Sequence, residues 1–122
     1  MDKNNNIGGL CQCGSVQYIV PEEPVEIANC HCTICQRVHH RPYVGFAKYP
    51  KNEVEFFGLE HVKTLRTSPK AVRGYCSKCN TYLYMMYDNS PTVWLVTENF
   101  NFPTDNIEHY NIYTDTAIVP LP

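Results

Sequence analysis

The sequence predicts a mainly β domain of short strands with little or no helix. Short runs rich in β-branched and aromatic residues alternate with turn residues along most of the chain, and only residues 33–41 could form a helical turn or two. The nine prolines and nine tyrosines suit a fold of strands and tight turns. Such a chain is expected to fold as a β sandwich, a barrel or a folded sheet.

The expected strands follow one another along the chain. The first, at 15–20, places alternate apolar residues on one face, and Pro21 ends it. Pro42 restricts the residue before it, so the helical segment should end at Arg41. Further strands are expected at 25–28, 43–49, 54–57, 62–67, 81–87, 92–96 and 107–113.

Length and composition limit the class of protein. A chain of 122 residues and 14.1 kDa fits one domain, which we expect to span residues 1–122. The sum of Lys and Arg is 10 and that of Asp and Glu is 12, so the formal net charge is −2. This charge makes direct binding to nucleic acid unexpected. A domain of this size has a thin core that benefits from a metal or a disulfide as a staple.

The sequence suggests neither export nor membrane insertion. Residues 1–6 are polar, and no apolar stretch of a signal peptide follows them. The apolar run 93–96 is far too short to cross a bilayer. We therefore expect the chain in a reducing compartment, the cytoplasm or also the nucleus, with no membrane partner. In such a compartment free thiols bind metals rather than each other.

Seven cysteines carry the chemistry of this chain. They form three clusters, Cys11-x-Cys13, Cys30-x-Cys32-x-x-Cys35 and Cys76-x-x-Cys79. An odd number of cysteines cannot pair completely into disulfides within the chain, and a thioredoxin-like CxxC would need a βαβ setting that the sequence does not suggest. Zinc takes four nitrogen or sulfur ligands, and Gly14 and Asn80 supply backbone suited to the tight turns that bring such ligands together.

Counting the available ligands assigns the cysteines to two zinc ions. A complete tetrahedral site needs four ligands, so the 7 cysteines of the chain can complete one site but not two. The middle cluster can place all of its sulfurs on one ion, which leaves the outer two pairs for the other. The predicted ligands are Cys11, Cys13, Cys76 and Cys79 at a structural site, and Cys30, Cys32 and Cys35 at an open site. His31, His39 or His40 could instead complete the second site, because histidine is a common zinc ligand.

Three segments resemble the motifs of a known family. They are residues 9–18 (GLCQCGSVQY), 30–37 (CHCTICQR) and 73–83 (RGYCSKCNTYL). Over about residues 8–97, the order and spacing of all seven cysteines are similar to those of the glutathione-dependent formaldehyde-activating family, which includes the centromere protein V group. The resemblance implies a β-tent fold of short antiparallel strands stapled by two zinc ions, with the same division of ligands. It also implies carbon–sulfur lyase activity on an adduct of glutathione and formaldehyde.

The chain departs from the family pattern at three places. They are Gln36, the pair His39-His40, and Asn80. The first two departures border the open site and so concern the identity of the substrate. The third is conformationally mild, because asparagine also tolerates a left-handed backbone.

The predicted open site suits a thiol better than water. Three thiolates around Zn²⁺ leave a net charge of −1, which weakens the ability of the ion to acidify water, whereas zinc accepts sulfur ligands readily. A thiol that loses its proton on binding could add to formaldehyde. We therefore expect a zinc-dependent carbon–sulfur lyase-like enzyme that acts on a small thiol adduct such as S-(hydroxymethyl)glutathione. The sequence identifies no catalytic acid or base.

Nearby cations are expected to offset the charge of the open site. Arg37 and Arg41 follow the middle cluster, and Arg73 could hold a carboxylate of a peptide-like thiol. The alternative function is a non-catalytic zinc-binding adaptor, with the second site closed by histidine and a chromatin role like that of the centromere protein V group. An imidazole on the second metal would favour the adaptor, and a response of one metal to an added thiol would favour the enzyme.

Overall fold

The computed structural model describes residues 7–122, and strands make up most of its regular structure. The strands are β1 (Gly8–Leu10), β2 (Gln17–Ile19), β3 (Glu26–Cys30), β4 (Val44–Pro50), β5 (Glu55–Phe57), β6 (Val62–Ser68), β7 (Ala71–Cys76), β8 (Tyr82–Tyr87), β9 (Thr92–Val96) and β10 (Glu108–Ile112). Within the described residues the single α-helix is α1 (Thr33–His39). Short 3₁₀ segments lie at Lys51–Glu53, Leu59–His61, Thr97–Asn99 and Thr114–Thr116. The prediction of a mainly β fold with little helix is confirmed.

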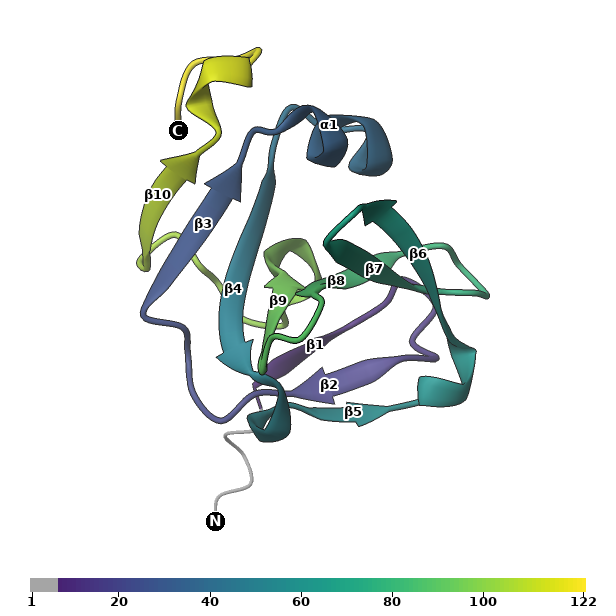
Figure 1. Ribbon diagram of the computed structural model, residues 1–122. Coiled ribbons are helices and arrows are strands. Elements are labelled where there is room, and N and C mark those ends of the chain that lie inside the picture. Colours follow the sequence, from purple (N-terminus) through teal and green to yellow (C-terminus); the bar gives the residue numbers. More distant parts are fainter. Residues whose placement is uncertain (1–6) are drawn as a thin grey trace.

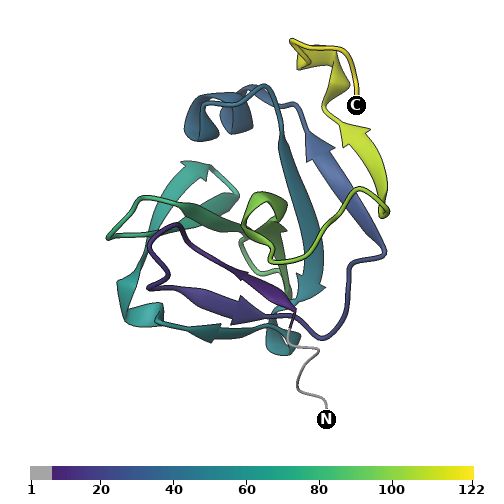
Figure 2. The same cartoon turned by 180° about the vertical axis from the view of Figure 1, so that it is seen from behind.

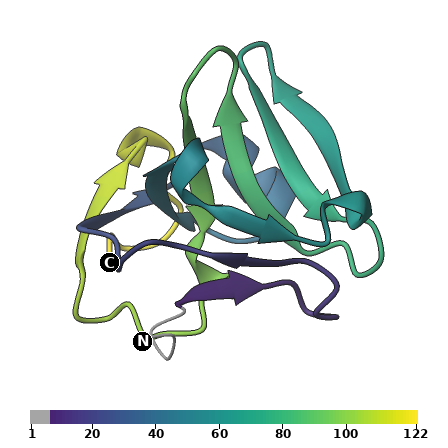
Figure 3. The same cartoon turned by 90° about the horizontal axis from the view of Figure 1, so that it is seen from below.

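The strands form two sheets. One has seven strands in the order β10-β3-β4-β9-β8-β7-β6, and the other has three in the order β1-β2-β5. The smaller sheet lies at one end of the larger one, and α1 lies at the opposite end (Figures 1 and 2). The larger sheet is bent, with β3 and β10 on one side and β6 and β7 on the other (Figure 3).

Strand pairing is antiparallel throughout the described sheets, with one exception. β10 runs parallel to β3, so the expectation of antiparallel strands alone is not met at this edge. β9 and β10 run in the same direction, because β3 and β9 are both antiparallel to β4 and β10 is parallel to β3. A connection between such strands must be longer than a hairpin turn, and residues 97–107 provide it.

The sequence patterns do not predict two of the observed strands, β1 and β7. β1 contains Gly8 and Gly9, and β7 carries Arg73 and Gly74 among its apolar residues, so neither shows the composition of a typical strand. Gly9 packs directly against the Tyr18 side chain, and a Cβ on it would collide with the ring. The glycines that hide β1 from sequence analysis are therefore required by its close packing on β2.

The helix α1 is shorter than expected. It ends at His39, and His40 takes a left-handed conformation with a φ of 54° as the C-cap. The expected end at Arg41, before Pro42, therefore lies beyond the cap rather than in the helix. Cys32 is the N-cap, so the middle cysteine cluster spans the start of α1.

Two expectations concern the surroundings of the chain. Residues 1–6, on which the expectation of no export signal rests, lie outside the described residues. From residue 7 onward, no helix has the length and apolar character needed to span a membrane.

Two hydrophobic clusters fill the interior, and each contains cysteines. The first lies between the three-stranded sheet and strands β4, β8 and β9, and it includes Cys11 and Cys76. The second lies among β3, β4, β7, β8 and α1, and it includes Cys30 and Cys35. These four thiols are at most 3% exposed. Both cysteine groups are therefore built into the core.

Candidate metal centres

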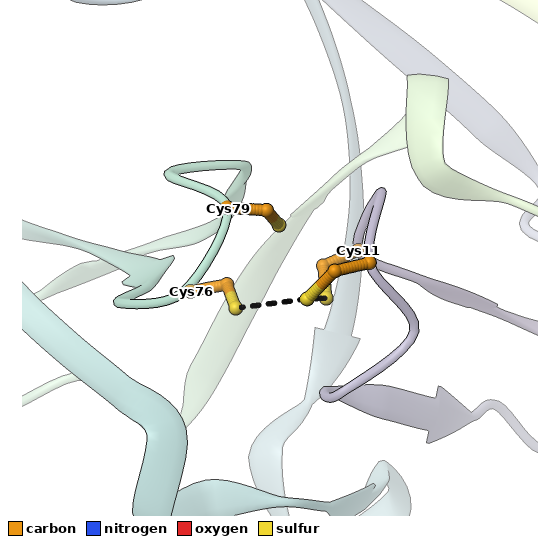
Figure 4. Close-up of side chains that lie close together, drawn as sticks. Cys11, Cys76 and Cys79 are labelled. Carbon is orange, nitrogen blue, oxygen red and sulfur yellow. Dashed lines mark hydrogen bonds between the residues drawn. The ribbon is translucent and has the colours of Figure 1, made fainter.

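Four thiols meet where two turns from different sheets face each other. Cys11 and Cys13 lie in the turn between β1 and β2, whereas Cys76 and Cys79 lie at the turn between β7 and β8. All four sulfur atoms lie within 4.8 Å of one another, and Cys13 Sγ is 3.6 Å from Cys11 Sγ and 3.8 Å from Cys76 Sγ. Figure 4 shows Cys11, Cys76 and Cys79 pointing toward one another. We call this group the four-thiol cluster.

Each turn is closed by a main-chain hydrogen bond and a residue of positive φ. In the first turn, the N–H of Gly14 donates to the carbonyl of Cys11 at 3.0 Å, and Gly14 has a φ of 79°. In the second, the N–H of Asn80 donates to the carbonyl of Cys76 at 2.7 Å, and Asn80 has a φ of 65°. Glycine and asparagine adopt this backbone at low cost, so the sequence folds both pairs into tight turns.

The electrostatic surroundings of the four thiols are unequal. Burial raises the pKa of the Cys76 thiol to about 11. The N–H of Lys78 lies 3.4 Å from the same sulfur and favours its ionised form. A hydrogen bond with Ser15 lowers the pKa of the Cys13 thiol. An ion that replaces these protons would therefore bind one readily ionised thiol and one that resists ionisation.

The donor atoms of this cluster suit a tetrahedral metal site. Two thiolates bound to one zinc ion at about 2.3 Å lie about 3.8 Å apart. The sulfur–sulfur separations of 3.6 Å and 3.8 Å agree with this value. Four sulfur donors favour a soft ion such as zinc over magnesium or calcium, which prefer oxygen. The geometry thus fits the predicted ligand set, and the binding of zinc itself stays a prediction.

The other three thiols gather at the start of α1. Cys30 ends β3, Cys32 caps the helix, and Cys35 lies in its first turn. Cys30 Sγ lies 3.4 Å from Cys32 Sγ and 3.3 Å from Cys35 Sγ, and Cys32 Sγ accepts a hydrogen bond from the N–H of Cys35 at 3.3 Å. The thiol of Cys30 donates to Cys32, which lowers the pKa of Cys32 and raises that of Cys30. The hydrogen bonds within this three-thiol cluster therefore favour the ionised form of Cys32 over that of Cys30.

No fourth ligand from the protein joins the three-thiol cluster within residues 7–122. His31 is buried, and its Nε2 lies 3.0 Å from Oδ1 of Asn111. The Nε2 of His39 lies 3.0 Å from Nη1 of Arg73. His40 is the exposed C-cap of α1. None of the three histidines that were candidates for the fourth ligand therefore lies with the three sulfur atoms.

A cavity of about 300 Å³ lies beside the three-thiol cluster. Its walls come from α1, the β6–β7 hairpin, β8 and the segment after β10. The lining residues are Cys30, Cys32, Ile34, Cys35, Thr67, Ser68, Pro69, Lys70, Ala71, Arg73, Met85, Tyr87 and Tyr113. Apolar and aromatic side chains dominate, with a few hydroxyl groups among them. The cavity can hold a small molecule in contact with the sulfur atoms.

Arg73 is buried against the three-thiol cluster and is only 2% exposed. Its Nη2 donates to Cys35 Sγ at 3.3 Å and its Nε donates to Thr67 Oγ1 at 3.2 Å. Because a guanidinium can only donate, the Nε2 of His39 must accept from Nη1. Burial, aided by the charge of Arg73, lowers the pKa of His39 to about 4 and keeps it neutral. Each of the three nitrogens of Arg73 has a partner within the protein, and the expected binding of a substrate carboxylate by Arg73 stays a prediction.

The other expected cations do not reach the thiols. Arg41 forms an ion pair with Glu98 at 2.8 Å, and both side chains are more than half exposed. Arg37 is exposed on α1. The cation that contacts the cluster, Arg73, is 38 residues from Cys35 in the sequence. No local signal could reveal this contact, because it depends on the packing of β7 beneath the start of α1.

The fold and the clusters define a class of small β protein with two cysteine groups of the kind that hold metal ions. Over residues 6–115 the chain matches the family described as glutathione-dependent formaldehyde-activating enzyme, and it belongs to that family. The resemblance inferred from the three motifs is thereby confirmed.

Comparison with individual proteins supports the fold. A solved structure of a Rhodobacter sphaeroides protein is similar, with a TM-score of 0.65 and 15% sequence identity over 84% of this chain and 99% of that chain. At this identity the similarity concerns the fold alone. A comparison with curated proteins finds no match.

Proposed function

We propose that this chain is a zinc-dependent carbon–sulfur lyase-like enzyme that forms or cleaves an adduct between a small thiol and formaldehyde. The observation that carries the proposal is the unequal donor sets. One cluster offers four sulfur atoms, whereas the other offers three, with no fourth donor from residues 7–122 and a cavity of about 300 Å³ beside it. A closed site is typical of a structural metal, and an open one is typical of catalysis. Membership of a formaldehyde-activating family supports the same reaction class.

In this proposal one cluster would stabilise the fold and the other would bind the substrate. Cys11, Cys13, Cys76 and Cys79 would hold a structural ion, and Cys30, Cys32 and Cys35 would hold the ion that meets the substrate. Zinc bound by three thiolates supplies a soft Lewis acid that lowers the pKa of an incoming thiol. The cap of α1 fixes Cys32, and the guanidinium of Arg73 fixes Cys35. The surrounding hydrophobic cluster limits the access of water.

The reaction requires one proton to move from sulfur to oxygen. In the synthetic direction, the S–H bond of the thiol breaks, a C–S bond forms at the carbonyl carbon, and the proton ends on the carbonyl oxygen. Cleavage reverses these steps. Thr67, Tyr87 and Tyr113 line the cavity and carry the hydroxyls that would be candidates to donate to that oxygen. Thr67 accepts from Arg73, which leaves its own proton for the substrate, and burial raises the pKa of Tyr87 so that it stays protonated.

A small thiol such as glutathione would be the partner of the open site. The seven cysteines are all free thiols, which suits a reducing compartment such as the cytoplasm or the nucleus. The alternative function, a non-catalytic adaptor, depends on a histidine that closes the second site. No histidine nitrogen lies with the three sulfur atoms in the part of the chain that the structure describes, so no observation favours this alternative.

Cobalt substitution tests the proposal, because Co²⁺ reports the ligands of each site through its absorption. The chain should bind two Co²⁺ ions, and added glutathione should change the absorption of one of them. S-methylglutathione, which lacks the thiol, is the matched control and should have no effect. Cys32→Ser should abolish the response to glutathione and the formation of S-(hydroxymethyl)glutathione. If two Co²⁺ ions bind but their absorption does not change with any thiol tested, a thiol substrate is excluded.

A further inference from the structure

Arg73 is a buried charge that has no carboxylate partner among residues 7–122. It is 2% exposed, and arginine stays protonated at any pH that proteins tolerate. None of the ion pairs found among residues 7–122 includes it. A buried cation is costly unless an anion compensates it. The compensating charge must therefore come from groups other than Asp and Glu.

The thiols of the open site are the groups in place to supply that charge. Nη2 of Arg73 donates to Cys35 Sγ at 3.3 Å, and Cys35 Sγ lies 3.3 Å from Cys30 Sγ. The Phe46 ring packs against the guanidinium at 5.8 Å from its centroid. His39 and Thr67 accept from the two remaining nitrogens. These contacts fix the orientation of the guanidinium and aim one N–H at the sulfur.

We infer that Arg73 is a positioning residue that balances the charge of the three-thiolate metal site and thereby allows a fourth, thiolate ligand to bind there. This inference rests on the proposed function, since it requires a divalent ion at Cys30, Cys32 and Cys35. Three thiolates and one Zn²⁺ carry a net charge of −1, which the guanidinium cancels. A fourth thiolate then brings the buried site to −1 rather than −2. The N–H···S bond also reduces electron donation from Cys35, so the ion keeps a stronger attraction for an added sulfur.

The four-thiol cluster lacks this arrangement. Its sulfurs accept main-chain N–H groups, such as that of Lys78, and Cys13 is exposed to water. Water and backbone dipoles can therefore balance its charge without a buried cation. The two clusters thus differ in their counter-charge as well as in their number of ligands. The four-thiol cluster serves as an internal reference for any test of Arg73.

Replacement of Arg73 by Met and by Lys tests the inference. Met has a similar length and removes the charge and the hydrogen bonds, whereas Lys keeps the charge but lacks the planar guanidinium whose three nitrogens contact Cys35, Thr67 and His39. Arg66→Met is the matched control, because Arg66 lies on the neighbouring strand β6, is half exposed and pairs with Asp88 at 3.0 Å. Each variant is loaded with Co²⁺. The measurements are the affinity of each site in competition with a chelator, the sulfur-to-cobalt absorption and the affinity for glutathione.

In Arg73→Met we expect about 10–100-fold weaker binding at the three-thiol site, a shift of its sulfur-to-cobalt band to lower energy, and a further loss of affinity for glutathione. The four-thiol site should not change. Arg73→Lys should keep most of the wild-type metal affinity, and its sulfur-to-cobalt band should lie between those of the wild type and Arg73→Met. Arg66→Met should match the wild type in every measurement.

Identical spectra and affinities in wild type and Arg73→Met would overturn the inference. If Arg73→Met does not fold, a wild-type band position in Arg73→Lys would overturn it as well. A wild-type chain that binds fewer than two Co²⁺ ions would instead refute the proposed function, so the two failures are distinguishable.

Discussion

Serine substitution in the two cysteine clusters should have very different effects on stability. Cys76→Ser should unfold the chain, whereas Cys32→Ser should leave it folded and inactive. The four-thiol cluster joins turns of different sheets, since Cys13 and Cys76 are 63 residues apart. The three-thiol cluster joins residues that are at most 5 apart, Cys30 and Cys35. A metal at the first cluster therefore ties distant parts of the fold together, and a metal at the second does not.

The expected magnitudes follow from these separations. Closing a loop of 63 residues rather than 5 restricts the unfolded chain by about 2 kcal/mol more. The apparent binding energy of a structural zinc site is about 10–16 kcal/mol, which is comparable to the whole stability of a small domain, about 5–15 kcal/mol. Cys76 is also 0% exposed, so a serine there buries a hydroxyl at a cost of about 1–3 kcal/mol. Serine at position 32 keeps a good helix N-cap in place of Cys32.

Circular dichroism and urea unfolding of metal-loaded protein measure this difference. We expect Cys32→Ser to unfold cooperatively with one bound metal, and Cys76→Ser to show no cooperative transition. Chelation of the metals from the wild type should reproduce the behaviour of Cys76→Ser. The reasoning is refuted if both variants lose equal stability, or if Cys76→Ser keeps the melting temperature of the wild type.

Three further outcomes are expected. Relative to His39→Gln, the wild type should lose stability as the pH falls from about 6.5 to about 4. Burial lowers the pKa of His39 from 6.5 to about 4, so the unfolded chain binds the proton first. Urea unfolding across this range measures the effect, and an equal dependence of the unfolding free energy on pH in both proteins would contradict it. Gly74→Ala should lower the free energy of unfolding by about 1–3 kcal/mol, because the new Cβ would collide with the Tyr84 ring. Gly14→Ala has open space around the Cβ but a φ of 79°, so it should lower the free energy of unfolding by about 1 kcal/mol; thermal unfolding measures both. Ile34→Trp should fill the cavity, retain both Co²⁺ ions and lose the spectral response to glutathione, and a retained response would place the thiol elsewhere.

The three groups of cysteines that lie close in the sequence could be predicted to act together, because the geometry within each group is local. Spacings of two or three residues bring sulfurs together whenever the backbone turns, and Gly14 and Asn80 indicate where it does. The pairing of Cys11 and Cys13 with the distant Cys76 and Cys79 follows from counting ligands rather than from any local pattern. The structure brings the four sulfurs within 4.8 Å of one another.

The surroundings of the clusters could not be predicted in the same way. The contact of Arg73 with Cys35 requires the register of β7 against its neighbours, and β7 was missed because Arg73 and Gly74 interrupt its apolar pattern. Gln36, a departure from the family pattern, donates from its side-chain amide to the carbonyls of His31 and Thr116, both at 2.8 Å. It thus ties α1 to the segment after β10, which no single-sequence pattern could indicate.

The positions of the two clusters allow one small fold to keep a structural metal apart from a reactive one, as the proposed function requires. The four-thiol cluster lies in the hydrophobic cluster between the two sheets, where any change of ligand would alter their packing. The three-thiol cluster lies where Cys30 ends β3 and Cys32 caps α1, and its predicted ligands span only six consecutive positions. Under the proposed function, a thiol in the cavity would contact α1 and the β6–β7 hairpin rather than the β1–β2 and β7–β8 turns that hold the four-thiol cluster. Arg73, which lies on β7 and donates a hydrogen bond to Cys35, is the side chain that links the first turn of α1 to the larger sheet.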